Sequence, residues 1–197
     1  MNQPSLTPEQ LRKRRRNRIG LLAIFGLFFG VMLFAGLLRF SGWRPATLKT
    51  HGTLLNPPLD ARELAPTTSD GRAYAWGQNG GERRWRLLVV NGATCAAQCE
   101  AVAADLDKVW QLMGQNKDKL DVLWMGATPQ KTQVHNLYRL PVDASLKSVL
   151  PADGNAPTAQ GMPVYIIDPN GFIMMRFAPG ADVSGIRADL AKVLKLI

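Results

Sequence analysis

The longest uniform feature of the hydrophobic pattern is an uncharged run near the N-terminus. Residues 19–38 read IGLLAIFGLFFGVMLFAGLL and contain no charged side chain. At about 1.5 Å per residue, some twenty apolar residues match the roughly 30 Å hydrocarbon layer of a bilayer. The run is apolar on every side, whereas a buried core helix is usually shorter and has a polar face. We therefore predict a transmembrane helix over residues 19–40.

A cleavable signal peptide is the main alternative for this run. Its apolar region would be about 7 to 15 residues long and would end at a small-x-small cleavage site. The run here is longer, and the sequence FAGLLRFSGW at its end has no Ala-x-Ala pattern. An uncleaved signal anchor therefore fits the sequence better.

In the rest of the chain, short apolar runs alternate with apolar residues at helical spacing. Residues 83–90 (RRWRLLVV) are predicted as a strand that ends at the turn signal Asn91-Gly92, and residues 120–126 (LDVLWMG) as a buried parallel strand. Between them, residues 95–113 are rich in Ala and Leu, and their apolar spacing of about 3.6 predicts a helix. The residues on its predicted buried face are Ala97, Ala101, Leu106, Val109 and Leu112.

The remaining pattern predicts two further helices and a hairpin. Residues 129–140 (PQKTQVHNLYRL) are predicted as a short helix. Residues 163–177 hold two β-rich runs joined by DPNG, in which Pro starts and Asn-Gly closes a turn, so they are predicted as a hairpin. Residues 181–197 combine apolar residues at helical spacing with Lys192 and Lys195 near the end, as expected of an amphipathic helix.

The charges that flank the first apolar run predict its orientation. Residues 11–18 (LRKRRRNR) hold six basic side chains, whereas Arg39 and Arg44 are the ones close behind the run. The positive-inside rule places the N-terminus in the cytoplasm and residues from about 41 onward on the other side. In a bacterium, this predicts a single-pass protein of the inner membrane whose C-terminal part lies in the periplasm, where thiols are readily oxidised.

The same basic segment explains most of the net charge of +9. Seven of the 24 Lys and Arg residues, but one of the 15 Asp and Glu residues, lie within residues 1–40. Residues 41–197 are therefore only mildly basic, and the excess is a signal of membrane topology. We expect the membrane, and no nucleic acid, among the partners.

The order strand, helix, strand, helix, hairpin, helix predicts an α/β fold with a central mixed sheet flanked by helices. A Cys pair where the first strand meets the first helix makes this the thioredoxin-like arrangement. We therefore predict a thioredoxin-like domain over residues 69–197. Residues 1–18 are expected to form a basic cytoplasmic tail, and residues 41–68, rich in Pro, Thr and Gly, a periplasmic tether.

Both cysteines of the chain, Cys95 and Cys99, lie at this junction of strand and helix. Unpaired N–H groups and the positive end of the helix dipole favour a thiolate at a position such as Cys95. Cys99 lies one turn deeper on the same face, so the two sulfurs can bond if the first turn is irregular, or can hold one soft metal ion. A functional dithiol is the favoured interpretation, and a structural disulfide or two buried free thiols are the alternatives.

Met162 and Pro163 directly precede the predicted strand VYIID. Thioredoxin-like folds carry a cis-proline at this place, packed against the cysteine loop, and cis peptide bonds are nearly confined to X-Pro. Pro163 is therefore expected to belong to the site in the cis form, with a trans proline that begins a strand as the alternative. Met162 is expected mainly to fill the core.

Four stretches of the extramembrane part carry a family resemblance. They are SDGRAYAW before the first strand, the CAAQC pair, EAVAADLDKVWQLM after it, and VYIIDPNGFIMMRFAPGADVSGIRADLAKVLKL near the end. They resemble the Sco/SenC proteins, which are membrane-anchored, thioredoxin-like assembly factors for the copper centre of cytochrome c oxidase. The chain is more similar still to an offshoot of that family, small transmembrane proteins found beside oxidase genes in proteobacteria.

The resemblance implies copper ligands that this chain only partly has. Sco/SenC proteins bind copper with both cysteines and a histidine shortly before the hairpin, where this chain has Gln160. They also usually have proline after the second cysteine, whereas Glu100 follows Cys99 here. His51 falls in the expected tether, and His135 falls in the predicted short helix, where we expect it on the surface. The three-ligand copper site of the family is therefore not visible.

Without the imidazole, thiol–disulfide exchange becomes the leading hypothesis, and the expected activity is that of a thiol–disulfide oxidoreductase. Cys95 would attack a target disulfide as thiolate, and Cys99 would resolve the mixed disulfide. The resemblance implies the target, which is the pair of cysteines in the copper-bearing subunit of cytochrome c oxidase.

Two alternatives stay open. Copper(I) is soft and accepts thiolate and thioether sulfur, so Cys95, Cys99 and Met162 could hold it in a copper-delivery protein. The other alternative is a membrane-tethered scaffold whose thioredoxin-like fold has lost its chemistry. No other cofactor is expected, because the sequence has no phosphate-binding loop and no calcium-binding loop.

Overall fold

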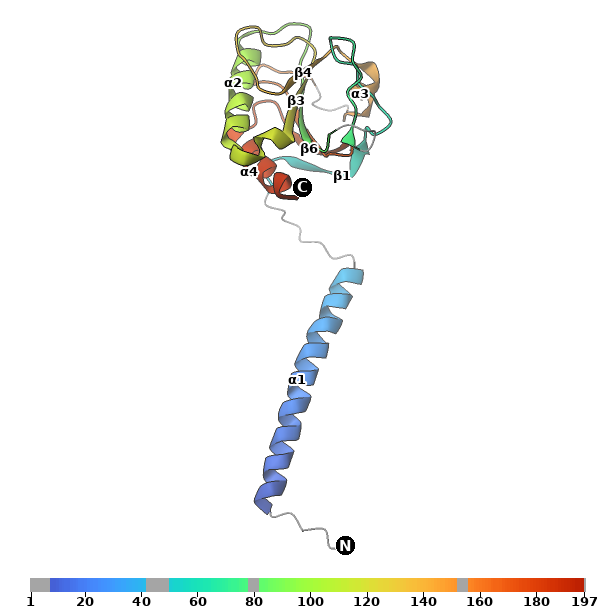
Figure 1. Ribbon diagram of the computed structural model, residues 1–197, viewed down its shortest axis with the longest axis vertical. Coiled ribbons are helices and arrows are strands. Elements are labelled where there is room, and N and C mark those ends of the chain that lie inside the picture. The colour runs from blue at the N-terminus through green and yellow to red at the C-terminus, as the bar shows by residue number, and fades with distance from the viewer. Residues whose placement is uncertain (1–7, 42–49, 78–81, 152–155, 197) are drawn as a thin grey trace. The chain divides into compact units, whose positions relative to one another are not determined.

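The computed structural model describes residues 8–41, 50–77, 82–151 and 156–196. The chain divides into two compact units, Met1–Leu48 and Lys49–Ile197. Figure 1 shows both units, coloured from blue at the N-terminus to red at the C-terminus.

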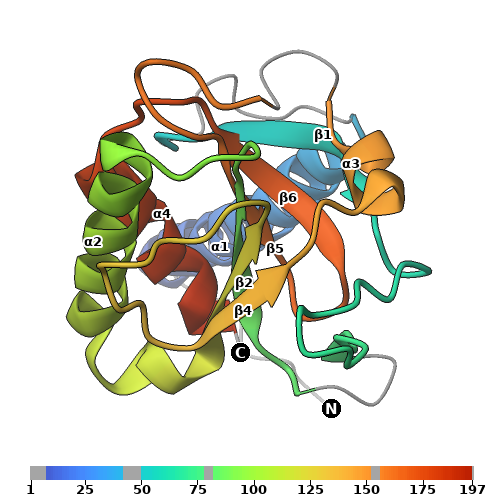
Figure 2. The same cartoon turned by 90° about the horizontal axis from the view of Figure 1, so that it is seen from above.

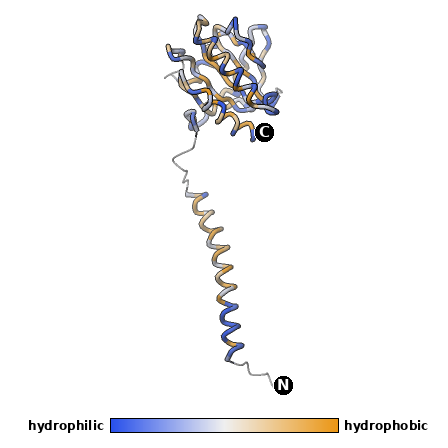
Figure 3. Tube along the Cα trace, turned by 90° about the vertical axis from the view of Figure 1, so that its left-hand side faces the viewer, coloured by the Kyte–Doolittle hydropathy of each residue, from blue (hydrophilic) through white to orange (hydrophobic). Residues whose placement is uncertain are grey.

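The described part of the N-terminal unit is essentially one helix, α1 (Pro8–Phe40). It is long and apolar enough to cross a membrane, and none of its residues is buried by other parts of the chain. Figure 3 shows hydrophilic residues in its first turns and hydrophobic residues in the remainder. The helix predicted over residues 19–40 is thus confirmed. It begins earlier than predicted, at Pro8, because proline is favoured in a first helical turn, so the basic segment is helical as well.

The C-terminal unit is a six-stranded sheet with the order β1-β6-β5-β2-β3-β4. Its strands are β1 (Thr53–Asp60), β2 (Trp85–Val90), β3 (Leu120–Met125), β4 (Leu137–Leu140), β5 (Val164–Ile167) and β6 (Phe172–Phe177). Its helices are α2 (Ala97–Leu112), α3 (Ala144–Val149) and α4 (Val183–Val193), with 3₁₀ helices at Gly114–Lys119 and Leu194–Leu196. Figure 2 shows α2 and α4 on one face of the sheet and α3 on the other.

Strand β2 lies at the centre of the sheet. It pairs in parallel with β3, from Trp85 opposite Leu120 to Val90 opposite Met125, and antiparallel with β5. Every residue of β2 and β3 is buried, because successive side chains alternate between two core clusters, one under α2 and α4 and one beside α3. The predicted α/β class with a mixed central sheet flanked by helices is confirmed.

The hairpin predicted over residues 163–177 is confirmed as β5 and β6. Asp168 closes its turn, since Oδ1 accepts the backbone N–H of Asn170 at 2.9 Å and of Gly171 and Phe172 at 2.8 Å. Gly171 has a φ of 107°, and a Cβ there would lie 3.0 Å from the indole of Trp76. The turn therefore requires glycine at this position.

The short helix predicted over residues 129–140 is wrong. The structure has irregular chain there, followed by β4, which pairs in parallel with β3. Asn136 has a φ of 51° and donates from Nδ2 to the carbonyl of Leu120 at 3.1 Å, which turns the chain into β4. A short run of mixed polarity does not distinguish the period of a helix from that of a strand. Here the segment forms a strand because it pairs with the edge of β3.

The tether expected over residues 41–68 is shorter than predicted. It contains β1, which runs antiparallel to β6 with Thr53 opposite Arg176. The prolines that suggested a tether are tolerated because β1 is an edge strand whose register shifts midway. The sheet therefore already begins at Thr53, within the segment expected to be a tether. Residues 1–7 and 42–49 of the expected tail and tether lie outside the described part.

Two buried charged residues lie at the amino ends of β2 and β3. Arg86 is 1% exposed and Asp121 is 3% exposed. Arg86 Nε donates to the hydroxyl of Tyr74 at 2.8 Å, and that hydroxyl donates to Asp121 Oδ2 at 2.6 Å. Arg84 Nη1 lies 3.2 Å from Asp121 Oδ1. Burial raises the pKa of Asp121, although the Tyr74 hydrogen bond and the Arg84 charge oppose this shift.

Asp189 on α4 anchors the start of the C-terminal unit. Its side chain is 1% exposed, and Oδ2 accepts the backbone N–H of His51 at 2.6 Å and of Gly52 at 3.0 Å. Lys192 Nζ donates to Oδ1 at 2.9 Å. Burial raises the pKa of Asp189, but the hydrogen bonds from Gly52, Lys192 and His51 outweigh it and hold the pKa below its usual value. An ionised carboxylate thus joins the entering chain to the C-terminal helix.

Replacement of Asp189 by alanine is expected to lower the free energy of unfolding by about 2 kcal/mol, because two backbone N–H groups lose a charged acceptor. The measurement is urea denaturation of the full-length protein in detergent, followed by tryptophan fluorescence. Asp105→Ala is the matched control, since its exposed pair with Lys108 contributes little. The pKa of Asp189 is lower in the folded than in the unfolded protein. Its contribution to the free energy of unfolding is therefore present at neutral pH and is lost as the pH falls below the pKa of a free carboxyl group. Equal stability of the two variants would contradict the anchor.

Candidate functional site

A disulfide bond joins Cys95 and Cys99, whose Cα atoms are 5.2 Å apart. Helix α2 begins at Ala97 because Ala96, its N-cap residue, has an extended backbone with φ −100° and ψ −168°. Cys95 therefore lies before the helix and folds back onto Cys99 in the first turn. The prediction that the two sulfurs can bond at an irregular helix start is confirmed.

The two cysteines differ in access. Cys99 is 3% exposed and packs in the core cluster under α2 and α4. Cys95 is partly exposed and lines an open groove formed by the segments that follow β2, β3 and β4. A sulfur atom that approaches from outside therefore reaches Cys95 first, and Cys99 is its internal partner.

Asn91 contacts the buried sulfur. It directly follows β2 and is 7% exposed. Its Nδ2 lies 3.4 Å from Cys99 Sγ and donates to the carbonyl of Ala127 at 2.5 Å, while its Oδ1 accepts the N–H of Gly92 at 2.8 Å. Trp124 Nε1 donates to the same Ala127 carbonyl at 2.8 Å. These bonds fix the orientation of the Asn91 amide, with nitrogen toward the sulfur.

Gly126 lets the segments after β2 and β3 approach each other closely. It has a φ of 95°, and a Cβ there would lie 2.6 Å from the carbonyl oxygen of Asn91. The N–H of Ala127 then donates to the carbonyl of Gly92 at 3.0 Å. The result is that the Ala127 carbonyl oxygen lies 3.9 Å from Cys99 Sγ.

Glu100 ties α2 to the chain that follows β3. Its Oε1 accepts the N–H of Gln130 at 2.8 Å and of Lys131 at 3.1 Å, and its Oε2 accepts the N–H of Thr132 at 2.9 Å. The hydrogen bond from Gln130 is the largest of the causes that lower the pKa of Glu100 to about 2. Glu100 therefore acts as a clamp that holds residues 130–132 against the start of α2, which carries Cys99.

Met162 and Pro163 lie at the start of β5. Met162 is 4% exposed, packs in the same core cluster as Cys99, and lines a small cavity with it. The Met162–Pro163 peptide is not in the cis form expected from the sequence, and the cis peptide among the described residues is Asn56–Pro57. Pro163 instead extends the sheet, because its carbonyl accepts an N–H from the end of β2 at 3.2 Å.

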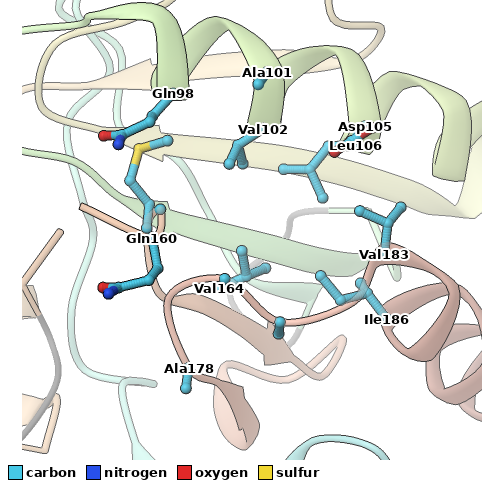
Figure 4. A pocket seen from close by; sticks show the side chains of 14 residues that line it. Gln98, Ala101, Val102, Asp105, Leu106, Gln160, Val164, Ala178, Val183 and Ile186 are labelled. Atoms are coloured by element: carbon cyan, nitrogen blue, oxygen red, sulfur yellow. The ribbon is translucent and has the colours of Figure 1, made fainter. Parts of the chain in front are cut away.

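A groove of about 240 Å³ separates α2 from the segment that leads into α4. Figure 4 shows Val102 and Leu106 of α2 opposite Ile186 of α4, with Gln98 and Gln160 at one end. The Gln98 side chain donates to a backbone carbonyl of the loop that carries Gln160. Gln160, which stands where Sco/SenC proteins have a histidine, thus places a neutral amide at the rim of a mainly apolar groove.

Each histidine is paired with a carboxylate. His135 lies in the loop before β4, where Nδ1 is 2.7 Å from Asp107 Oδ1 and the ring stacks on Trp110 at 4.2 Å between centroids. His51 Nδ1 lies 3.4 Å from Asp189 Oδ1. Across the described residues, no group of three His, Cys, Asp or Glu side chains could hold a metal ion.

The sequence prediction missed the role of Asn91. Its pairing with Gly92 was interpreted as a turn signal, and the contact with Cys99 follows only from the fold. The available signal was a polar residue directly after the apolar run Leu87–Val90, four positions before the first cysteine. Ala127 could not have been identified, because it contributes a backbone carbonyl.

The C-terminal unit matches a known protein family. The family model described as "Transmembrane-like, thioredoxin-like, C-terminal domain" matches residues 85–197. No curated protein matches the chain. The predicted thioredoxin-like domain is therefore confirmed.

Solved structures share this fold at low sequence identity. The apo form of Trgpx has 13% identity, covers 69% of this chain and 95% of its own, and has a TM-score of 0.50. GPX1 of T. cruzi has 17% identity, covers 69% of this chain and 97% of its own, and also has a TM-score of 0.50. Copper-bound ScoI of Arabidopsis thaliana has 14% identity, covers 75% of this chain and all of its own, and has a TM-score of 0.46. The similarity to Trgpx and GPX1, at these identities, concerns the fold alone.

Replacement of Glu100 by alanine is expected to release the segment that it clamps. Because its pKa is about 2, the carboxylate accepts the three N–H groups at neutral pH and loses them only as the pH falls toward 2. Amide hydrogen exchange at Gln130, Lys131 and Thr132 is expected to be about tenfold faster in the variant than in the wild type. Glu63→Ala, at an exposed position, is the control. Unchanged exchange in Glu100→Ala would disprove the clamp.

Proposed function

Because the chain belongs to the family of transmembrane-like proteins with a thioredoxin-like C-terminal domain, we propose that it is a membrane-anchored protein that exchanges thiols and disulfides through Cys95 and Cys99. The observation that carries this proposal is the asymmetry of the pair. One bond joins a partly exposed sulfur-bearing residue to a buried one, at the carboxyl end of the central strand. This arrangement allows attack from outside and resolution from inside.

The reaction uses the two cysteines in turn. In the reduced protein, the Cys95 thiolate attacks one sulfur of a target disulfide, and the other target sulfur leaves as a thiolate. Cys99 then attacks the Cys95 sulfur of the mixed disulfide, and the second target sulfur leaves. The target gains two electrons, and the protein is left with the Cys95–Cys99 disulfide found in the structure.

The position of Cys95 supports its role as the attacking group. It lies two residues before the first residue of α2, where N–H groups without intrahelical partners point toward the approaching chain. These groups and the helix dipole stabilise a thiolate, which is the nucleophilic form of cysteine. The open groove at Cys95 gives a target sulfur room to approach.

The topology that we propose follows from α1. Its basic first turns favour a cytoplasmic N-terminus at the inner membrane of a bacterium. On this topology the C-terminal unit lies in the periplasm, where disulfides form and persist. A dithiol held there by a membrane helix is suited to targets that are themselves membrane proteins.

The target class that we propose rests on the resemblance to Sco/SenC proteins in the CAAQC pair and the C-terminal stretch. It is the cysteine pair of the copper-bearing subunit of cytochrome c oxidase. Cysteine binds metals as thiolate, so an oxidised pair must be reduced before copper can enter. A membrane-anchored reductant would supply this step.

Copper delivery is the second candidate, favoured by Met162, which lines the same cavity as Cys99. The residues present do not fit the three-ligand site that the resemblance implies. Both sulfurs of the pair are joined to each other. Gln160 stands in the place of the histidine, and its Oε1 accepts the hydroxyl of Thr158 at 2.8 Å. Thiol–disulfide exchange needs no metal and fits these residues better.

Single substitutions of the two cysteines are expected to impair the exchange reaction at different steps. The assay incubates reduced full-length protein in detergent with an oxidised peptide that carries the two cysteines of the oxidase subunit. Cys99→Ser is expected to accumulate a mixed disulfide, visible on a non-reducing gel. Cys95→Ser is expected to react about a hundredfold more slowly than wild type, because the remaining thiol is buried.

Thr94→Ala, beside the pair at an exposed position, is the control and is expected to react like wild type. Equal rates for wild type and Cys95→Ser would refute the assigned roles. If neither cysteine variant changed peptide reduction or oxidase assembly in cells, the protein would instead be a redox-inactive scaffold.

Copper(I) binding separates the two candidate functions. The reduced full-length protein is expected to lose copper(I) to a chelator of moderate affinity, and Met162→Ala is expected to behave like wild type. The measurement is retained metal per chain after gel filtration. Stoichiometric retention that Met162→Ala abolishes would favour copper delivery over exchange.

A further inference from the structure

Each cycle of the exchange reaction places a negative charge on Cys99, which is 3% exposed. To start a new cycle, a thiolate of a dithiol electron donor attacks Cys95, so the bond between the two sulfurs breaks and its electron pair stays on Cys99 Sγ. Burial disfavours the charged form of a thiol. The immediate surroundings of Cys99 Sγ therefore decide how readily the bond opens.

Asn91 offers a hydrogen to this sulfur. An amide nitrogen carries two hydrogens. One is taken by the carbonyl of Ala127, and the other is available to Cys99 Sγ, which lies 3.4 Å from Nδ2. A donor stabilises a thiolate more than a sulfur in a disulfide, because hydrogen bonds to charged groups are stronger.

The same contacts leave a protonated Cys99 with a poor acceptor. The carbonyl oxygen of Ala127 lies 3.9 Å from Cys99 Sγ. A carbonyl oxygen has two lone pairs, and this one already accepts from Asn91 Nδ2 and Trp124 Nε1. The thiolate thus meets a free donor, whereas the thiol meets an acceptor that is already occupied. The site distinguishes the charged sulfur from the neutral one.

Among the described residues that line the cavity at Cys99, no charged side chain replaces Asn91 in this role. The described residues that line the cavity at Cys99 are all uncharged. Glu100, next to Cys99 on α2, is negative and directs its carboxylate to three backbone N–H groups beyond β3. Arg139 at the end of β4 lines the groove of Cys95 instead. The Asn91 amide is therefore the donor in contact with the buried sulfur.

We propose that Asn91 is the positioning residue of the exchange reaction, which stabilises the Cys99 thiolate and thereby sets the reduction potential of the pair. This inference rests on the proposed exchange function and deepens it. Asn91 acts through Cys99 and does not touch the target. Its orientation is held by the N–H of Gly92 on Oδ1, so the amide cannot turn its oxygen to the sulfur without losing that bond.

The test uses full-length protein in detergent with Asn91→Ala and Asn91→Asp. Opening of the oxidised pair by dithiothreitol is expected to be about tenfold slower in Asn91→Ala, because the leaving thiolate loses a hydrogen bond. It is expected to be slower still in Asn91→Asp, which puts a carboxylate oxygen beside the sulfur. At pH 9, the equilibrium with glutathione is expected to shift about tenfold toward the disulfide in Asn91→Ala, which is about 30 mV.

A second variant keeps the test valid if changes at Asn91 impair folding. Trp124→Phe keeps an aromatic ring in the core but removes the hydrogen bond from Trp124 Nε1 to the Ala127 carbonyl. One lone pair of that carbonyl can then accept the hydrogen of a protonated Cys99. In a Cys95→Ser background, the absorbance of the thiolate is expected to report a higher measured pKa of Cys99 for both Trp124→Phe and Asn91→Ala. Tyr74→Phe, which weakens the buried hydrogen-bond network at the amino ends of β2 and β3, is the stability control. It is expected to leave the opening rate, the glutathione equilibrium and the Cys99 titration unchanged.

The possible outcomes are distinct. Unchanged opening rate, equilibrium and Cys99 titration in both Asn91→Ala and Trp124→Phe would overturn the role of Asn91. So would a shift of the same size in Tyr74→Phe, because it would reflect stability alone. If wild-type protein reduced no target peptide while its disulfide opened normally, the proposed function would fail and the role of Asn91 at the disulfide would stand.

Discussion

The close approach of the chain segments that follow β2 and β3 is the constraint on which the site depends. Parallel pairing ends both strands at the same edge of the sheet, and a left-handed glycine, Gly126, brings the two segments into contact there. Cys99 Sγ lies against Asn91 and the Ala127 carbonyl of these two segments, whereas Cys95 lines the open groove beside them. The difference in access between two identical side chains is therefore a property of the backbone path.

The central part of the fold could be predicted from the sequence, and its edges could not. β2 and β3 are buried on both faces, so they appear as mainly apolar runs, in which Arg86 and Asp121 are the charged residues. The edge strands β1 and β4 have mixed patterns, because one side of each lacks a neighbouring strand and pairing partners decide their conformation. Residues 53–60 consequently resembled a tether, and residues 137–140 resembled the end of a helix.

The candidate site was predicted in its sulfur atoms and missed in its polar surroundings. The spacing of Cys95 and Cys99 and their place at a helix start could be interpreted from local rules. The buried face of α2 was predicted only in part. Leu106 and Val109 are buried, but Ala97 and Ala101 are exposed and Leu112 is 62% exposed, because the helix turns Cys99 and Trp110 toward the core. Contacts between segments far apart in the sequence depend on tertiary structure, which periodicity does not encode.

The bond between the two sulfurs encloses a very short ring, since the cysteines are four positions apart. Opening so short a ring releases little chain entropy, because the freedom regained grows only with the length of chain enclosed. The sheet and helices are therefore expected to have nearly the same shape in both oxidation states. Oxidation and reduction are then expected to change the conformation only at the start of α2, and the rest of the domain keeps its structure through repeated cycles.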